Sequence, residues 1–207
     1  MKRDFKRQRR SLAVIKIRNI FRNLGLRQGL NYLLFRLYTH FIFDERYKQL
    51  LTATTFKGYH PPPGFTVKPF NSIDDVPEQD LVYMRRNQIY STLADFQDYL
   101  EDDRTLWICY ENGVPAGYEF SMTKGHKAYL TEGEVFIDFR GKHYFALLHC
   151  HIIAILLAQG VEEIGSSVHV LNTPSIRASE ETGFEKINKK VFTRLGGRLF
   201  QRRSCQG

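Results

Sequence analysis

Hydrophobic residues follow a helical period in the first quarter of the chain. Apolar side chains recur at intervals of three and four at Ala13, Ile17, Ile20, Phe21 and Leu24, as they do on one face of an amphipathic helix. Residues 30–43 are apolar around most of the circumference, but this stretch is shorter than the roughly 20 residues that span a bilayer. We therefore expect a basic, amphipathic helical extension over residues 1–60, interrupted at Gly25 and Gly29 and ended by the prolines of residues 60–64.

Residues 61–207 show the mixture of patterns that is typical of an α/β domain. The pattern predicts helices over residues 72–103 (two of them), 145–159 and 174–182. It predicts strands over residues 65–70, 105–111, 114–122, 129–139, 163–171, 184–193 and 198–202. Asn112-Gly113 is a hairpin signal, and Pro69 places its strand at an edge. This order predicts a mixed sheet with flanking helices, antiparallel at first and with a helical crossover later.

The positive charge of the chain is concentrated in residues 1–50. This segment holds thirteen Lys and Arg against three Asp and Glu, a net charge of +10, whereas the whole chain carries +8 and the remaining residues therefore −2. Two interpretations explain this basic segment. It could form a helical hairpin that packs on the main domain, with a solvated basic tail, or it could make peripheral contact with an anionic membrane. Nucleic-acid and presequence interpretations are weaker alternatives, and Lys16 and Arg18 argue against a signal peptide.

The cysteines and histidines do not form a recognisable metal or disulfide pattern. Cys109, Cys150 and Cys205 are an odd number without CxxC spacing, which indicates reduced thiols in a cytoplasmic compartment. His149 and His151 lie two positions apart on an expected helix, about 200° around its axis, so they cannot converge on one ion. We expect no metal site.

Several motifs occur together in the second half of the chain. Val135–Lys142 (VFIDFRGK) precedes an apolar helix and a strand, and Asn172–Arg177 (NTPSIR) then opens a short helix that closes at Gly183-Phe184. Together with the hairpin glycines Gly113 and Gly117, this arrangement resembles the GCN5-related N-acetyltransferase (GNAT) superfamily over residues 65–195. The resemblance implies a bacterial-type acyltransferase that moves an acyl group from acetyl-CoA or another acyl-CoA to an amine by direct attack. The acceptor would be a small molecule such as an amino sugar.

The junction between the strand and the apolar helix is the expected donor site. A helix N-terminus leaves backbone N–H groups unpaired, which favours an anion such as a pyrophosphate. The resemblance implies that coenzyme A contacts Val135, Ile137, Arg140, Gly141, Lys142, His143, Tyr144, Asn172 and Ser175. The sequence departs from the family pattern because His143 and Phe145 replace two loop glycines.

Two carboxylates are candidates for the general base. Glu132 and Glu134 are two apart on a predicted strand and therefore share one face; we favour Glu134 as the base, and the alternative is that both are surface carboxylates. The family's general-acid tyrosine corresponds to Ser179, a weak acid. Two other functions remain: a catalytically degenerate GNAT-fold module that binds a partner or a membrane, and a relative that transfers aminoacyl groups from tRNA.

Overall fold

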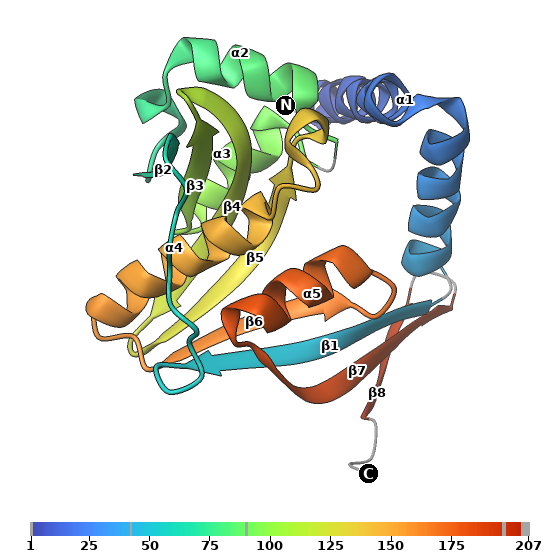
Figure 1. The fold of residues 1–207 in the computed structure, drawn as a ribbon. Coiled ribbons are helices and arrows are strands. Elements are labelled where there is room, and N and C mark those ends of the chain that lie inside the picture. Colours follow the sequence, from blue (N-terminus) through green and yellow to red (C-terminus); the bar gives the residue numbers. More distant parts are fainter. Residues whose placement is uncertain (1, 42, 90, 196–197, 204–207) are drawn as a thin grey trace.

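A computed structural model describes residues 2–41, 43–89, 91–195 and 198–203 (Figure 1). Its strands are β1 (Phe43–Thr52), β2 (Phe65–Phe70), β3 (Thr105–Glu111), β4 (Val114–Lys124), β5 (Lys127–Val135), β6 (Glu163–His169), β7 (Glu185–Leu195) and β8 (Arg198–Arg203). Its helices are α1 (Lys2–Phe41), α2 (Glu78–Asn87), α3 (Leu93–Glu101), α4 (Tyr144–Ala158) and α5 (Thr173–Thr182), with short 3₁₀ turns η1 (Ile73–Asp75) and η2 (Ile137–Phe139). The mixed α/β class is confirmed.

The strands form a mixed sheet in the order β2-β3-β4-β5-β6-β1-β7-β8. Each neighbouring pair is antiparallel except β5 and β6, which are parallel. This parallel contact extends only over residues 127–129 of β5 and 163–165 of β6. Beyond it the two strands separate, as Figure 1 shows, so the sheet has two halves that meet at one end and open at the other.

Residues 43–52, at the end of the expected helical extension, differ from that expectation. These residues do not continue a helical extension but form β1, which pairs with β6 on one side and β7 on the other. Strand β1 is therefore an interior strand of one half of the sheet, and the side chain of Leu51 on it is completely buried. Chain segments on both sides of the expected boundary build a single sheet.

Helix α1 bends at Gly25, whose φ of 73° and ψ of 173° lie outside the helical region and suit a residue without Cβ. The part before the bend contacts α2 and α3. The side-chain amide of Asn19 donates to the carbonyls of Arg85 and Gln88, both at 3.1 Å, and the ammonium of Lys16 lies 2.8 Å from the carboxylate of Asp95 on α3. The part after the bend runs down to β1 (Figure 1). Helix α1 therefore connects the two halves of the sheet on their open side, rather than folding into the expected hairpin.

The helices cover opposite faces of the sheet. Phe96 of α3 packs its ring against Tyr118 of β4, with ring centroids 4.6 Å apart. Glu119, the next residue of β4, instead contacts His149 of α4. Because successive strand residues point to opposite faces, α3 and α4 lie on different sides of β4.

The other expected strands, and the expected helices after residue 143, are confirmed with ends that differ by no more than four residues. Asn112 and Gly113 adopt the positive φ angles, 51° and 82°, of a tight hairpin turn. Strand β5 ends at Val135 rather than at residue 139, because the chain turns into η2. Cys109 is buried and Cys150 is partly buried, both as free thiols, and Cys205 lies outside the described residues.

Candidate active site

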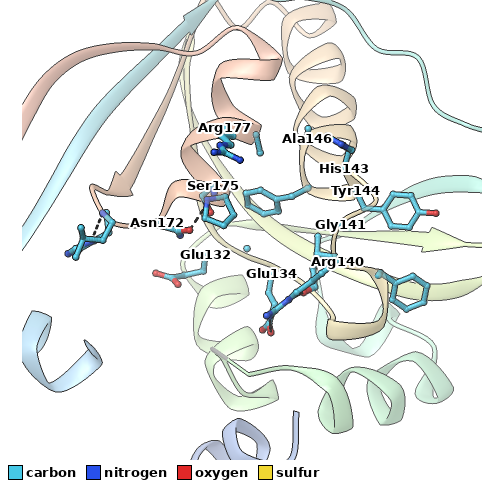
Figure 2. Close-up of a pocket in the computed structure, with 18 of the residues that line it drawn as sticks. Glu132, Glu134, Arg140, Gly141, His143, Tyr144, Ala146, Asn172, Ser175 and Arg177 are labelled. Carbon is cyan, nitrogen blue, oxygen red and sulfur yellow. Dashed lines mark hydrogen bonds and ion pairs between the residues drawn. The ribbon is translucent and has the colours of Figure 1, made fainter. Parts of the chain in front are cut away.

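A cleft of about 980 Å³ occupies the opening between β5 and β6 (Figure 2). Its walls come from the end of β5, the loop before α4, the beginnings of α4 and α5, the second part of α1, and β1. Most of the predicted site residues line this cleft: Glu132, Glu134, Val135, Arg140, Gly141, His143, Tyr144, Asn172 and Ser175. The separation of two strands thus produces a site that neither strand would make alone.

The N-terminus of α4 faces the cleft without a side-chain cap. The residue at the cap position, His143, has a left-handed φ of 59° and makes no capping hydrogen bond, and the first turn of the helix contains no acidic residue. The ring nitrogen Nδ1 of His143 lies 3.2 Å from a carboxylate oxygen of Glu181 on α5. The first N–H groups of α4 therefore retain the capacity to bind an anion.

Arg140 and Lys142, both predicted to bind the donor, lie in different places. Arg140 lines the cleft, and its Nε donates to the carbonyl of Val135 at 3.0 Å. Lys142 is not part of the lining: its ammonium group lies 2.9 Å from the carboxylate of Glu111 on β3. Burial and a hydrogen bond to the same Glu111 raise the pKa of Tyr144 to about 12, so its hydroxyl stays protonated at neutral pH.

Ser179, the candidate catalytic residue at the position of the family's general-acid tyrosine, does not line the cleft. Its side chain lies inside the fold with 2% of its surface exposed, and its hydroxyl donates to the carbonyl of Ser175 at 2.9 Å. The helix that carries it, α5, is capped at its N-terminus by Asn172, whose side chain accepts the N–H of Ser175. A catalytic role for Ser179 has no geometric support.

The two candidate bases differ in their surroundings. Glu134 has a side chain only 1% exposed; its carboxylate accepts the N–H of Ile89 at 3.0 and 3.1 Å and lies 3.5 Å from the guanidinium of Arg140. Tyr118 also donates to it, at 3.4 Å. Glu132 instead is exposed in the cleft (Figure 2). The preference for Glu134 therefore moves toward Glu132, which a substrate can reach.

Gly133, between the two glutamates, permits a close approach on the opposite face. A Cβ at this position would lie 2.9 Å from the ring of Phe145, the second residue of α4, and 3.3 Å from Cβ of Glu119. The centroid of the Phe145 ring lies 4.5 Å from that of the His149 ring.

Ile137, which was predicted to contact coenzyme A, lies in η2 and does not line the cleft.

Behind Phe145 lies a buried pair of side chains, His149 and Glu119. Nε2 of His149 is 2.7 Å from Oε1 of Glu119, and each side chain is 2% exposed. Burial raises the pKa of Glu119, and the neighbouring His149 opposes that increase. Among the described residues, neither Oε2 of Glu119 nor Nδ1 of His149 has a hydrogen-bond partner. This pair connects α4 to β4 beneath the cleft.

The structure adds a wall to the cleft that sequence reasoning missed. It comes from the second part of α1, from β1 and from the end of β6, through Asn31, Tyr32, Phe35, Arg36, Arg46 and His169. No local signal reveals these residues, because their place depends on the position of β1 in the sheet. Arg177 and Glu181 of α5 also line the cleft. Arg177 belongs to the NTPSIR motif, so the sequence motif could have indicated that this residue lies at the site.

In the part of the chain that the structure describes, no group of three or more His, Cys, Asp and Glu is arranged to hold a metal ion. Burial raises the pKa of Cys109 to about 12, which keeps this thiol protonated at neutral pH.

Comparisons with known proteins support the fold rather than a close relative. No family model and no curated protein matches the sequence. Solved structures do match: a GCN5-related N-acetyltransferase from Sphaerobacter thermophilus has a TM-score of 0.57 and 15% identity, over 77% of this chain and 54% of that one. A tandem GNAT protein from the clavulanic acid biosynthesis pathway gives 0.55 and 15%, over 70% and 51%.

A GNAT-family acetyltransferase from Colwellia psychrerythraea is similar over 85% of this chain and 63% of its own, with a TM-score of 0.55 and 14% identity. The chain thus spans about half to three-fifths of the length of these three structures. At these sequence identities, the similarity to the three structures shows the fold alone. The separated β5 and β6, the uncapped α4 and these structural matches together show that the chain has the fold of the GCN5-related N-acetyltransferases.

Proposed function

We propose that this protein is an N-acyltransferase that moves an acyl group, in the simplest case acetyl, from acyl-CoA to the amine of a small molecule. The observation that carries the proposal is the cleft between β5 and β6, which connects the two faces of the sheet. On one face it meets the uncapped N-terminus of α4, and on the other the carboxylate of Glu132. The fold of the solved N-acetyltransferases supports the same class of reaction.

The donor side fits coenzyme A through its backbone and its charge. The N–H groups of Tyr144, Phe145 and Ala146 begin a helix with no capping side chain, and Gly141 and Arg140 border the same space. These groups would hold a pyrophosphate, with Ser175 at the start of α5 opposite. When bound, acyl-CoA supplies an activated thioester. Phe145 occupies part of the space that a glycine would leave open, so the donor must pass its ring.

The acceptor side provides a proton acceptor. Glu132 projects into the cleft, and as a carboxylate it can take a proton from the ammonium form of the acceptor, directly or through one water. The freed lone pair of the nitrogen attacks the thioester carbonyl, the C–S bond breaks, and the departing sulfur takes its proton from solvent. Glu134 is a positioning residue: it fixes Arg140 and the backbone at Ile89, because its carboxylate contacts both.

Adjacent basic residues allow a matched test of the donor site. Arg140→Ala removes a guanidinium from the cleft, whereas Lys142→Ala removes an equal charge that contacts Glu111 outside it. Isothermal titration of acetyl-CoA should show a loss of affinity of about tenfold or more for Arg140→Ala. It should show a change of less than about threefold for Lys142→Ala.

Denaturation curves of both variants distinguish a loss of folding from a loss of acetyl-CoA binding. A folded wild-type protein that does not bind acetyl-CoA at millimolar concentration contradicts the proposal. That result supports the alternative in which His143 and Phe145 have closed the donor groove of a module without catalysis.

A second candidate function, peripheral contact with an anionic membrane, rests on the outer face of α1. Leu30, Leu34 and Leu37 are 51–55% exposed, although they are spaced like a buried helix face. They belong to the segment with a net charge of +10. Among the described residues, no helix is long and apolar enough to cross a membrane. The mode that we propose is shallow insertion of this face into the membrane surface from the cytoplasmic side.

Co-sedimentation with vesicles that contain anionic lipid tests this contact. Leu34→Glu should reduce pelleting several-fold, and raised salt should reduce it further because the basic groups are screened. Val82→Glu is the control, because Val82 is 44% exposed on α2, outside the basic segment. Equal pelleting of Leu34→Glu and wild type contradicts the membrane contact.

A further inference from the structure

The second part of α1 has two different faces. Asn31, Tyr32, Phe35 and Arg36 line the cleft, whereas Leu30, Leu34 and Leu37 are exposed. At 100° per residue, the centres of these two sets lie about 160° apart around the helix. The inward face therefore belongs to the site, and it contributes a wall that the bare sheet lacks.

This wall lies on the acceptor side of the cleft. Glu134 pairs across β4 and β5 with Tyr118, and Tyr118 packs against α3, so Glu132 and Glu134 project on the α3 face of the sheet. The donor helix α4 covers the other face. Helix α1 packs on α2, through Asn19, and its second part continues along the same open side of the cleft.

A cluster of basic and ring groups occupies this wall. Arg46 of β1 is the register partner of His169 of β6, so their side chains project from the same face. The ring of His169 meets the ring of Phe35 edge-on, with centroids 5.0 Å apart, and Arg36 is the next residue of α1. The N–H of Leu171 donates to Nδ1 of His169, which leaves its proton on Nε2 when the ring is neutral. Arg36, Arg46 and His169 are thus brought together by three different elements.

The charges of the cleft are divided between its two ends. Glu134 is held by Arg140, and Glu181 contacts His143, both at the donor end. On the acceptor side, the described lining presents the carboxylate of Glu132 and, from α1 and β1, the guanidinium groups of Arg36 and Arg46. Arg36 and Arg46 each also have a contact within the protein, and because a guanidinium carries five N–H donors it can bind a ligand oxygen beside that contact. A molecule with both an ammonium and an anionic group can therefore interact with Glu132 and with the arginines.

We propose that the acceptor is an amine that also bears an anionic group, a carboxylate or a phosphate, and that Arg36 and Arg46 bind this group while the amine lies near Glu132. The proposal rests on the N-acyltransferase function above and specifies its substrate class. Guanidinium groups suit this role because they donate two parallel hydrogen bonds to a carboxylate or phosphate. Helix α1 and β1 are then part of the substrate site and set its specificity.

Matched pairs of amines test the proposal with the full chain. The pairs are phenylalanine with phenethylamine, lysine with cadaverine, and glucosamine 6-phosphate with glucosamine, which separate carboxylate from phosphate recognition. Thiol release from acetyl-CoA gives kcat/KM for each amine. Titration of each amine into protein saturated with coenzyme A gives its affinity without turnover. At least one anionic member should exceed its partner by about 10- to 100-fold in both measurements, because a charge-assisted contact is present in only one of them.

The double variant Arg36→Gln/Arg46→Gln should reduce that preference to less than about threefold, while its affinity for acetyl-CoA stays within about twofold of wild type. Arg27→Gln is the control, because Arg27 is an exposed residue of α1 outside the lining of the cleft. It should keep the full preference.

Three results overturn the inference and leave the acyltransferase proposal intact. The first is equal use of the two members of every pair. The second is a preference that survives in the double variant, and the third is a double variant that loses acetyl-CoA rather than the anionic amine. Absence of acetyl-CoA binding by the wild-type protein instead overturns the proposed function itself.

Discussion

Replacing His149 with leucine removes the one hydrogen-bond partner that the Glu119 carboxylate has among the described residues, 2.7 Å away. Both side chains are 2% exposed, so water cannot compensate the carboxylate. The variant can avoid a buried charge by keeping Glu119 protonated. With an ordinary glutamate pKa of about 4.3, holding that proton costs about 3.7 kcal/mol at pH 7 and about 1 kcal/mol at pH 5.

The sign of the pH dependence follows from the raised pKa of Glu119. Between the unfolded and the folded pKa, the folded variant holds a proton that the unfolded chain has released, so stability falls as the pH rises. Because His149 no longer opposes the effect of burial on Glu119, His149→Leu should lower the free energy of unfolding by up to about 3–4 kcal/mol at pH 7 and by no more than about 1 kcal/mol at pH 5. Urea denaturation followed by circular dichroism at both pH values measures the difference.

Two further variants make this prediction specific. Glu119→Met combined with His149→Leu replaces the pair by apolar groups and should recover most of the lost stability at pH 7, because no charge stays buried. His126→Leu removes the histidine of an exposed pair, whose nitrogen lies 4.0 Å from Glu162, and should leave the denaturation midpoint unchanged. A cost of His149→Leu that is equal at the two pH values, or a double variant as unstable as the single one, would refute the reasoning.

Three other perturbations test the fold around the site. Asn19→Ala leaves the carbonyls of Arg85 and Gln88 without its amide and should cost about 1–3 kcal/mol in urea denaturation; a cost near zero would show that α1 is not fixed to α2. Gly133→Ala places a Cβ against Phe145 and should cost about 1–3 kcal/mol in the same assay, and an unchanged midpoint would contradict the close approach. A chain that begins at Gly64 lacks β1 and should show no cooperative unfolding by circular dichroism, whereas a stable domain would contradict the interior place of β1.

The sequence was sufficient to predict those parts of the structure that neighbouring residues determine. The hairpin at Asn112-Gly113 needs two positive φ angles, which these residue types adopt readily, and it forms where expected. The two carboxylates on one face of β5 follow from the period of a strand, and both line the cleft.

Strand β1 could not be predicted in this way, because its pattern resembles a helix. Its apolar residues Phe43, Tyr47, Leu50 and Leu51 follow intervals of four, three and one. The strand buries alternate positions that include Gln49, a polar residue with no exposed surface, and this hides the period of two. The pairing that decides the structure joins Thr52 to Glu163, which are far apart in the chain. The acceptor wall depends on the same pairing and was missed with it.

Thiol release from acetyl-CoA in the presence and absence of an amine tests the central claim, amine acylation in the cleft between β5 and β6, most directly. The account predicts amine-dependent release by the wild-type protein over the panel of amines above. Glu132→Gln should lower this rate by about 10²- to 10⁴-fold with little change in acetyl-CoA affinity. Glu162→Gln, at an exposed glutamate outside the cleft, should not lower it. A folded protein that binds acetyl-CoA but releases no thiol in response to any amine, or an undiminished rate in Glu132→Gln, would contradict the account.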